Sequence, residues 1–536
     1  MSSRTNRPTD VVIVGAGAGG AATAWRLATS GLSVVCLEQG GWVTPDSVPS
    51  LRPDWERARQ RSHHPNPNIR NNRWDYPVDD GESEINPLMY SAVGGSTIHW
   101  GAHFPRLRPN DFRVRTCDGV ADDWPLTYAD LEPYYDLNDQ WMGVAGLSGD
   151  PANPPRSHRP FPPLPLGAGG LCLASAFDRL GWHWWPVDAA ILTSPLGKRG
   201  ACNNCGPCDL GCPTGARAST DITYWPAALA AGVELVTEAR VRRVTMSASD
   251  RASGVEYIDA SGELVRQPAG AVVLAANGIG TPRLLLLSAN ADHPTGIANS
   301  SGLVGRRLMH HPTALVTGVF DEPLAGFMGP YAVSILSQEF YETDRDRGFL
   351  RGFQMQLIRS DGPLGAAVGG YQRPVPWGER HHVEFFRQFG HTASLTVTSE
   401  DLPDPANRVT LSRELVDSSG LAAPHVRYRV EPNARKILSY GIEKASLAMR
   451  EAGARELVVH DLISSAGFHL LGTARMGHDP TTSVVDARGR CHDVKNLFIA
   501  DGSLFVTAGA LNPTSTLQAL ALRVADAIVS GDVHAT

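Results

Sequence analysis

The sequence lacks three features that would each assign it to a familiar class of protein. No apolar run approaches the ~20 residues that a helix needs to span a bilayer. The net charge is −7 at pH 7, so no basic face for a nucleic-acid partner is expected. Four of the eight cysteines lie together between residues 202 and 212, which is unlike the spaced disulfide framework of a secreted domain.

The N-terminus has little that resembles an export signal. Arg4 and Arg7 precede an apolar stretch, but four glycines interrupt that stretch and no small-residue cleavage site closes it. We therefore expect a short leader followed by the first strand, and no signal peptide of the chain's own. The 536 residues, with 42% apolar and 19% charged side chains, are typical of a globular protein with roughly two to four domains.

Residues 11–38 predict a strand, a glycine-rich turn, a helix and a second strand. The turn carries Gly15, Gly17 and Gly20 in the spacing G-x-G-x-x-G, and the second strand ends at Glu38. Such glycines permit a tight turn and the close approach of a pyrophosphate to a helix N-terminus, while the terminal acid can bind a ribose hydroxyl. This unit predicts a dinucleotide site but does not separate FAD from NAD.

Later segments predict further strands and one long helix. The stretches "GVELVTEARVRRVTM" and "AGAVVLAANGIGTPRLLLLSAN" read as strands that rejoin the nucleotide domain, and residues 310–430 read as β-rich. Residues 433–452 predict an amphipathic helix that ends at Gly453. The final segment returns to strand, loop and helix.

The run "CNNCGPCDLGCP" places Cys202, Cys205, Cys208 and Cys212 in the spacing C-x₂-C-x₂-C-x₃-C-P. Bacterial ferredoxins hold an iron–sulfur cluster with such a run. Three interpretations compete: an Fe–S cluster, which we favour, a structural Cys₄ zinc site, and reduced thiols or one local disulfide. Four cysteines allow a [4Fe-4S] as well as a [3Fe-4S] cluster.

Four motifs, taken in order, resemble the glucose–methanol–choline (GMC) oxidoreductases. They are the glycine turn with Glu38, "VGGSTIHW", "LAANGIGTPRLLLLSA" and the C-terminal "HLLGTARMG…DGSLFVTAGALNPT". The likeness covers nearly the whole chain. Within the family, the chain is most similar to the large subunits of FAD-dependent glucose, fructose and gluconate dehydrogenases. It departs from them in the cysteine run, where those relatives show two adjacent cysteines before Cys-x₃-Cys-Pro.

The resemblance implies an α/β fold with a Rossmann-like FAD-binding domain assembled from several segments, plus a β-rich (α+β) substrate-binding domain of the GMC type. The FAD-binding domain would comprise residues 1–45, 86–115, 200–312 and 462–536, including the Cys-rich segment 202–213. Residues 46–85, 116–199 and 313–461 would form the substrate-binding domain and excursions.

The resemblance also implies which residues bind the cofactor. FAD would be bound by Gly15, Gly17, Gly20, Glu38, Gly94, Gly95, Ser96, Thr97, His99, Val241 and Asp501. In some relatives a histidine placed like His99 is covalently bonded to the flavin; that bond stays open here and is not favoured.

His469 and Asn512 match the catalytic pair of the family. The chemistry agrees, because oxidation of an alcohol by hydride loss needs a base within hydrogen-bond reach of the hydroxyl, and a neutral imidazole suits that role. Asn512 can donate to or accept from the same oxygen. For His103, His310 and His311 a purely structural role is the default interpretation.

The leading hypothesis is an FAD-dependent dehydrogenase that oxidises a sugar or glycoside and passes electrons through an Fe–S cluster to a cytochrome or quinone. The alternative in the same fold is an oxidase of sugars, glycosides, sterols or long-chain alcohols that uses O₂. A non-catalytic flavoprotein and a nicotinamide-dependent reductase are competitors from other classes. Cluster-containing relatives usually pair with a small subunit that carries the export signal, so the location stays open between the cytoplasm and co-export to the periplasm.

Overall fold

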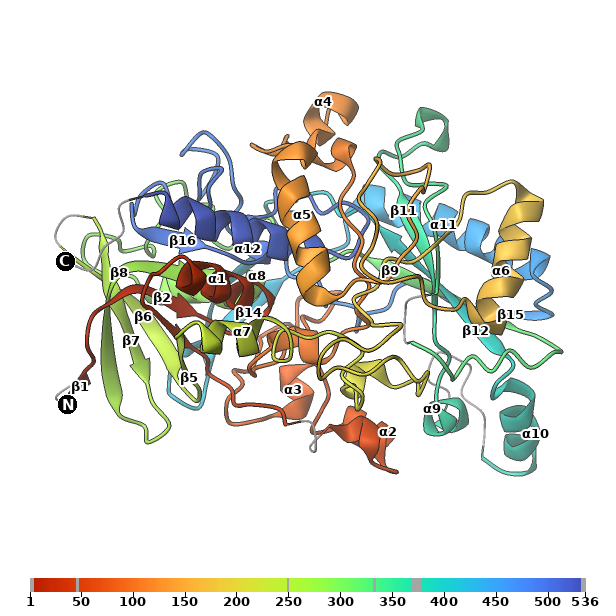
Figure 1. Cartoon of the computed structure of the whole chain (residues 1–536). Helices are drawn as coiled ribbons and strands as arrows, with labels where there is room; N and C mark the ends of the chain where they lie inside the picture. Colours follow the sequence, from red (N-terminus) through yellow and green to blue (C-terminus); the bar gives the residue numbers. More distant parts are fainter. Residues whose placement is uncertain (1–3, 45–47, 248–249, 331–333, 369–376, 532–536) are drawn as a thin grey trace.

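The computed structural model describes residues 4–44, 48–247, 250–330, 334–368 and 377–531. Two β-sheets lie along the molecule, and helices cover each of them (Figure 1). The first sheet contains strands from both ends of the chain, since β2 near the N-terminus and β16 near the C-terminus both pair with β8. The α/β prediction is therefore confirmed, with a second, antiparallel sheet beside the first.

The first sheet has the strand order β5-β3-β2-β8-β7-β6, with β1 and β16 also paired to β8. Its central part is parallel, which requires strands that are apolar on both faces. The run "VVIV" in β2 meets that requirement, because Val11, Val12 and Ile13 are fully buried. The strands are β1 (Arg4–Thr5), β2 (Thr9–Val14), β3 (Val34–Leu37), β5 (Glu234–Val236), β6 (Arg240–Met246), β7 (Ala252–Ile258), β8 (Leu264–Leu274) and β16 (Leu497–Ile499).

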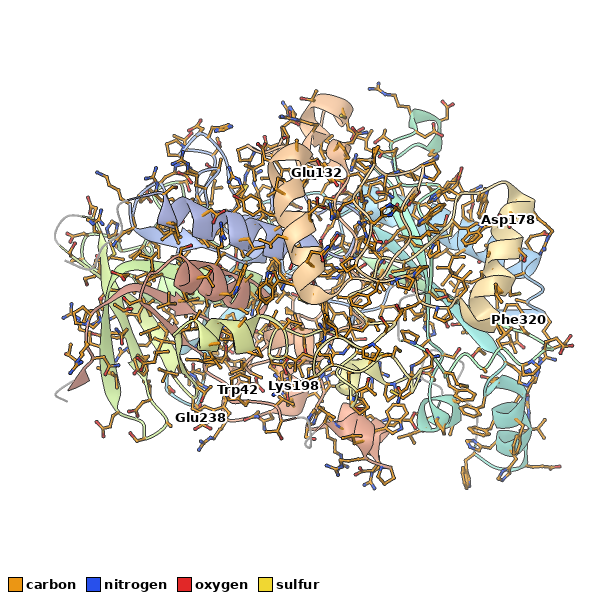
Figure 2. The ribbon with its side chains drawn as sticks, in the orientation of Figure 1. Trp42, Glu132, Asp178, Lys198, Glu238 and Phe320 are labelled. Atoms are coloured by element: carbon orange, nitrogen blue, oxygen red, sulfur yellow. The ribbon has the colours of Figure 1, made fainter. Side chains whose placement is uncertain are left out.

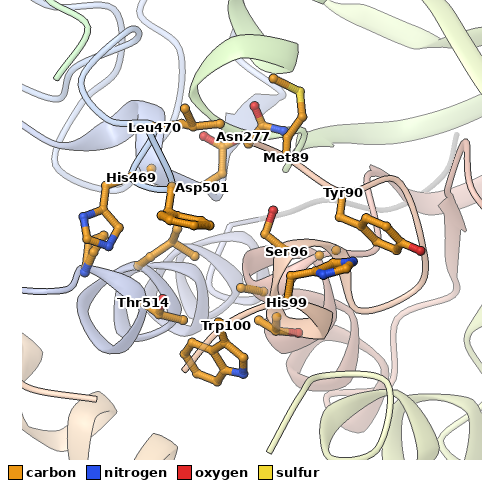
Figure 3. Close-up of a pocket in the computed structure, with 18 of the residues that line it drawn as sticks. Met89, Tyr90, Ser96, His99, Trp100, Asn277, His469, Leu470, Asp501 and Thr514 are labelled. Carbon is orange, nitrogen blue, oxygen red and sulfur yellow. The ribbon is translucent and has the colours of Figure 1, made fainter. Parts of the chain in front are cut away.

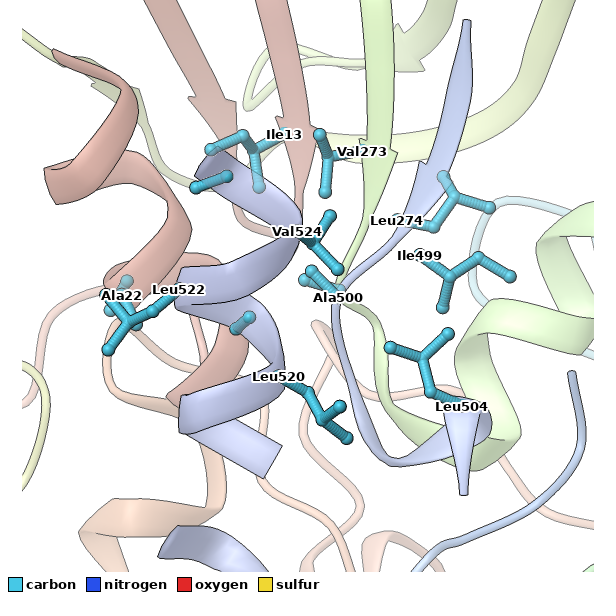
Figure 4. Close-up of a cluster of buried hydrophobic side chains, with 14 of the residues drawn as sticks. Ile13, Ala22, Val273, Leu274, Ile499, Ala500, Leu504, Leu520, Leu522 and Val524 are labelled. Carbon is cyan, nitrogen blue, oxygen red and sulfur yellow. The ribbon is translucent and has the colours of Figure 1, made fainter. Parts of the chain in front are cut away.

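Helices α1 (Ala18–Thr29) and α12 (Thr514–Val529) pack against each other over this sheet. Figure 4 shows Val524 of α12 beside Ile13 and Val273 of the strands, with Leu520 further along the same helix toward Leu504, all of them buried. Gly19 permits the approach of α1, because a Cβ there would lie 1.8 Å from the carbonyl oxygen of Ala500. Helices α5 (Tyr128–Met142) and α7 (Tyr224–Ala230) complete this layer.

The second sheet has the order β15-β9-β12-β11-β10-β4 and all its pairs are antiparallel. Helices α6 (Gly167–Leu180) and α11 (Pro432–Glu451) cover it. Figure 2 shows Asp178 on α6, where it is exposed, and Phe320, which belongs to the buried core. The strands are β4 (Trp185–Pro186), β9 (Thr313–Val319), β10 (Ile335–Ser337), β11 (Phe353–Ile358), β12 (Thr392–Ser399) and β15 (Glu456–His460).

A hairpin of β13 (Arg408–Val416) and β14 (Ala422–Arg427) packs on helix α8 (Asn277–Leu287). The remaining helices are short and lie in the connections. They are α2 (Trp55–Arg59), α3 (Pro67–Arg70), α4 (Val114–Asp118), α9 (Pro363–Val368) and α10 (Glu379–Gln388), with 3₁₀ turns at Pro49–Leu51, Gly95–Ile98, Pro109–Phe112, Cys208–Leu210, Arg345–Arg347 and Gly502–Leu504.

Most of the predicted elements are confirmed, and one is wrong. Helix α11 occupies the predicted 433–452 region, where Glu431 accepts hydrogen bonds from the N–H groups of Asn433 and Ala434 at its start. The stretch "AGAVVLAANGIGTPRLLLLSAN" is not strand throughout, because β8 ends at Leu274 and α8 follows. A short apolar run such as "LLLL" fits a buried helix as well as a buried strand.

Among the residues that the structure describes, no helix combines the length and the apolar character needed to cross a membrane.

Candidate active site

The site begins at the turn between β2 and α1, where two glycines are required. Gly15 has a φ of +101°, and a Cβ on it would lie 2.5 Å from the carbonyl oxygen of Ala275. A Cβ on Gly20 would lie 1.9 Å from the carbonyl oxygen of Gly15. No acidic residue lies in the first turn of α1. The N-terminal amides of this helix can therefore bind an anionic group such as a pyrophosphate.

Glu38 lies at the end of β3 beside this turn. Its buried carboxylate accepts hydrogen bonds from the N–H groups of Ala16 (2.8 Å) and Gly40 (2.9 Å). Burial raises the pKa of Glu38 to about 7, against the opposing effect of these amide donors. Each carboxylate oxygen keeps a second lone pair, so Glu38 can also accept a hydrogen bond from a ribose hydroxyl.

A second glycine pair brings another loop against the first turn. Gly94 and Gly95 have φ angles of +100° and +53°, and a Cβ on Gly95 would lie 2.8 Å from the Cα of Gly17. The hydroxyl of Thr97 donates to the carbonyl oxygen of Gly94 (2.5 Å) and accepts from the N–H of Thr220 (3.1 Å). The loop is thus held in place from both sides.

One cavity of about 380 Å³ runs from these turns to the face of the second sheet. Figure 3 shows residues that line it, with His469 on one side and Ser96 and His99 on the other. All the predicted cofactor-binding and catalytic residues line it except Gly20 and Gly94, which shape the two turns behind its wall. The lining residues among them are Gly15, Gly17, Glu38, Gly95, Ser96, Thr97, His99, Val241, His469, Asp501 and Asn512.

The residues of this cavity fit a dinucleotide such as FAD. Gly15, Gly20 and Gly95 let the two turns pack where a Cβ would clash with backbone atoms, and Glu38 offers a buried acceptor at one end. Asp501 is buried as well; its carboxylate accepts from the N–H of Ser503 (2.9 Å) and from the hydroxyl of Thr281 (2.5 Å). Burial raises the pKa of Asp501 above its usual value.

His469 and Asn512 meet at the far end of the cavity. The Nδ2 atom of Asn512 lies 3.5 Å from Nε2 of His469. Gln354 of β11 donates from Nε2 to Oδ1 of Asn512 (3.0 Å), which turns the NH₂ group of Asn512 toward His469. A substrate oxygen placed between the two residues could therefore donate its proton to His469 and accept a hydrogen bond from Asn512.

Three further histidines surround His469, for which a structural role is the default interpretation of the sequence. Nδ1 of His311 lies 2.9 Å from Nδ1 of His469, and Nδ1 of His310 lies 3.0 Å from the carbonyl oxygen of His469. His103 lines the cavity nearby. Burial lowers the pKa of His469 well below its usual value, and the three neighbouring histidines lower it further. The tandem histidines in "LMHHP" are the signal that the sequence offers for this cluster.

The second sheet provides the wall opposite the glycine turns. One part of this wall is polar and another is apolar, a mixture suited to a small polyhydroxylated molecule. The polar residues of the sheet are Thr313, Gln356, Thr396 and Thr398, and its apolar ones are Leu315 and Ile358. Ile463 and Phe468, which follow β15 in the chain, add to the apolar part.

The cysteine run forms a loop around a 3₁₀ turn. Cys202, Cys205, Cys208 and Cys212 all line one small cavity of about 10 Å³, together with Arg217. Burial tends to raise the pKa of the Cys212 thiol, but the N–H of Arg217 and the hydroxyl of Thr214 bring it below its usual value. Across the part of the chain that the structure describes, no three Cys, His, Asp or Glu side chains are arranged to hold one metal ion. Four thiols are suitable ligands for an iron–sulfur cluster, but their sulfur atoms are not positioned around a common point as the ligands of one metal ion would be.

This loop contacts the larger cavity through His99. Nδ1 of His99 donates to the carbonyl oxygen of Asp209 (2.9 Å), which lies between Cys208 and Cys212. The Asp209 carboxylate in turn pairs with Arg59 of α2 (3.0 Å). The Tyr90 ring contacts the other side of His99, at 4.1 Å between ring centroids (Figure 3). His99 therefore bridges the two sites.

Comparison with known families agrees with this geometry. Residues 176–313 and 403–521 each match a family model described as GMC oxidoreductase. Residues 13–71 match that of an NAD(P)-binding Rossmann-like domain.

Several known proteins are similar over nearly their whole length. The chain is 42% identical to 2-methyl-1,2-propanediol dehydrogenase of Mycolicibacterium austroafricanum, over 97% of this chain and 95% of that protein. It is 32% identical to the fructose dehydrogenase large subunit of Gluconobacter japonicus, over 97% and 98%. Formate oxidase of Aspergillus oryzae RIB40 superposes with a TM-score of 0.64 at 16% identity, covering 98% of both chains, which is a likeness of fold alone.

Proposed function

The chain belongs to the GMC oxidoreductase family, and from this membership and the geometry of the cavity we propose that it is an FAD-dependent enzyme that oxidises an alcohol or hemiacetal carbon of a sugar or small polyol. The observation that carries the proposal is the meeting of His469 and Asn512 at the end of a glycine-lined cavity. The mixed polar and apolar wall and the named substrates of the two relatives support the substrate class.

We propose that FAD is held without a covalent bond. The first turn and Glu38 would bind its ADP half with Val241, Asp501 would approach the pyrophosphate, and residues 94–97 and His99 would line the flavin. When bound, FAD supplies the hydride acceptor for the reaction. The chain segments 1–45, 86–115, 200–312 and 462–536 would form the FAD-binding domain, and the remaining segments would provide the substrate side.

His469 and Asn512 act on the same substrate oxygen, one as proton acceptor and the other as hydrogen-bond donor. The neutral His469 accepts the hydroxyl proton at Nε2, and Asn512 donates from Nδ2 to the same oxygen as negative charge develops on it. Gln354 holds the Asn512 amide in the donating orientation. Desolvation of the His469 ring lowers its pKa and so keeps it unprotonated.

The test is anaerobic bleaching of the bound flavin by 2-methyl-1,2-propanediol, fructose and glucose, followed by turnover with an artificial electron acceptor. We expect at least one alcohol to reduce the flavin. A His469→Ala variant should retain FAD but lose about 10²–10⁴-fold in kcat, the usual contribution of a general base. The exposed His478 provides a control, His478→Ala, that should match the wild type. A flavin that no alcohol reduces would contradict the proposal, and rapid oxygen uptake without acceptor would identify an oxidase.

Free FAD in the supernatant after acid precipitation of the protein is the expected result for non-covalent binding. A protein precipitate that stays yellow after acid treatment would instead indicate a covalent bond between the flavin and His99.

We also propose that Cys202, Cys205, Cys208 and Cys212 hold an iron–sulfur cluster. All four lie on one loop, thiolates are the usual ligands of such clusters, and His99 connects this loop to the flavin cavity. A cluster there would supply a one-electron carrier between the flavin and an external cytochrome or quinone. The similarity to a protein named as a large subunit supports a small partner subunit.

Iron and acid-labile sulfide per FAD in anaerobically purified protein test this second proposal. About three or four irons per FAD, lost in a Cys212→Ser variant, would support it. The isolated Cys117, which is exposed, gives the control variant Cys117→Ser. Zinc in place of iron, or no metal, would refute the cluster and leave the alcohol oxidation untouched.

A further inference from the structure

His311 lies behind the catalytic histidine with both ring nitrogens engaged. Its Nε2 atom is 2.5 Å from the carbonyl oxygen of Gly509, and its Nδ1 atom is 2.9 Å from Nδ1 of His469. The two rings meet edge to face, with centroids 4.9 Å apart. His311 is 1% exposed and does not line the cavity, so it touches the base but not the space where substrate would bind.

These contacts determine where the protons lie. A carbonyl oxygen only accepts, so Nε2 of His311 must carry the hydrogen that is donated to Gly509. A neutral His311 then has a lone pair at Nδ1, and the hydrogen in the contact between the rings must come from Nδ1 of His469. A neutral His469 is left with its lone pair at Nε2, the atom beside Asn512. Burial lowers the pKa of His311 to about 4, consistent with a neutral ring.

We propose that His311 is a positioning residue that fixes the tautomer of His469, so that Nε2 faces the cavity as a proton acceptor. The inference deepens the proposed function and rests on His469 being the base. When Nε2 takes the substrate proton, the His469 ring becomes a cation that still donates from Nδ1–H. Its hydrogen bond to His311 then becomes charge-assisted and stabilises the protonated base.

The backbone of His311 supplies an independent observation. Its φ is +73°, a left-handed conformation that is uncommon for a residue other than glycine. Neighbouring contacts hold it there: the N–H of His310 donates to the Asp401 carboxylate (2.7 Å), and the hydroxyl of Thr313 donates to the carbonyl oxygen of His311 (3.0 Å). Strain of this kind persists where the surroundings over-determine a conformation, and it clusters at functional sites.

The direct test is ¹⁵N NMR of the histidine-labelled, FAD-loaded protein at pH 7, with His469→Gln used to assign the His469 signals. We expect His469 to be neutral, protonated at Nδ1 and unprotonated at Nε2. A ring protonated at Nε2, or at both nitrogens, would overturn the inference. This readout needs no turnover, and it requires no variant at position 311 to fold.

Two variants of similar shape provide the second arm. In His311→Asn an amide oxygen can still accept from Nδ1 of His469, whereas His311→Leu offers no acceptor. We expect kcat to fall about 10–100-fold in His311→Leu with little change in KM, and to be largely restored in His311→Asn. The tautomer signal should be lost in the first and kept in the second.

His310 provides a matched control, because it is equally buried but donates to the backbone of His469 rather than to its ring. The variant His310→Leu should leave the His469 tautomer unchanged. Equal kcat in His311→Leu and His311→Asn would overturn the inference. An Nδ1–H tautomer in a protein that oxidises no alcohol would instead refute the proposed function and leave the tautomer assignment standing.

Discussion

At the scale of single residues, the base at the end of the cavity is kept neutral by what surrounds it. His469 is enclosed by His103, His310 and His311, and its own burial disfavours a second proton. A protonated imidazole cannot accept the substrate proton, so this environment preserves the active form of the base under mildly acidic conditions. Asn512 complements it with a neutral donor, which adds no charge to the cavity.

The pH dependence of turnover should show this effect. The usual histidine pKa is about 6.5, and the pKa of His469 lies well below it because of burial and the neighbouring histidines. Since the unprotonated form is the active one, kcat/KM should change less than about twofold between pH 8 and 6.5, and its decline should lie at lower pH. Initial rates at saturating acceptor concentration measure this profile. A half-maximal kcat/KM at or above pH 6.5 would mean that His469 is solvated or is not the base.

At the scale of elements, the cavity depends on the contact between two glycine loops. The turn before α1 and the turn before the 3₁₀ helix at Gly95–Ile98 approach so closely that a Cβ on Gly95 would lie 2.8 Å from the Cα of Gly17. Loops rather than strands thus form the floor of the site, and the parallel strands of the first sheet position both ends of it.

We expect Gly95→Ala to separate these loops. The new methyl group would lie 2.8 Å from the Cα of Gly17, at a φ of +53° that disfavours any side chain. Overpacking of this kind costs about 1–3 kcal/mol, which corresponds to roughly 5–150-fold weaker binding of FAD. Titration of the apoprotein with FAD, followed by flavin fluorescence, measures the change. Gly81→Ala is the control, since a Cβ there meets nothing within 4 Å. An unchanged FAD affinity in Gly95→Ala would show that the two loops can shift to accommodate the methyl group.

Helix α8 and the glycine turn show which secondary-structure elements can be predicted from local sequence. The turn is specified within residues 15–38, because the glycines, the helix and Glu38 are neighbours along the chain. Strand β8 is recognisable in the same way, but the apolar run of α8 has no periodicity that separates helix from strand. Elements whose pattern is complete within one window are predictable, whereas a buried apolar run that fits both helix and strand is not.

At the scale of the whole molecule, the catalytic end is only partly predictable, because its members come from distant segments. His469 and Asn512 are identified by their motifs. The role of His311 depends on Gly509, 198 positions away, and that of Gln354 depends on Asn512, 158 positions away. The tandem histidines mark His311 as a candidate but do not reveal its partners, and Gln354 belongs to no motif. Such partners become visible only when the second sheet packs against the nucleotide-binding part.

Asp401 joins three of these distant segments and makes stability depend on pH. Its buried carboxylate accepts from the N–H of His310 (2.7 Å) and the hydroxyl of Tyr428 (2.8 Å). Burial is the main cause that raises its pKa from 3.8 to about 7. The native state therefore binds more protons than the unfolded state between about pH 4 and 7. The stabilisation from this group is present below pH 4 and is lost as pH rises through 7, by about 1.4 kcal/mol for each pH unit crossed.

The variant Asp401→Asn should remove this dependence, because an amide oxygen can still accept both hydrogen bonds but does not ionise. We expect the difference in Tm, variant minus wild type, to rise by on the order of a few degrees between pH 4.5 and pH 8. Thermal unfolding followed by circular dichroism across that range measures it. The exposed Asp346 gives the control, Asp346→Asn, whose difference should stay flat. A flat difference for Asp401→Asn as well would mean that its carboxylate is ionised throughout, and that the junction of the His310, Asp401 and Tyr428 segments tolerates a buried charge.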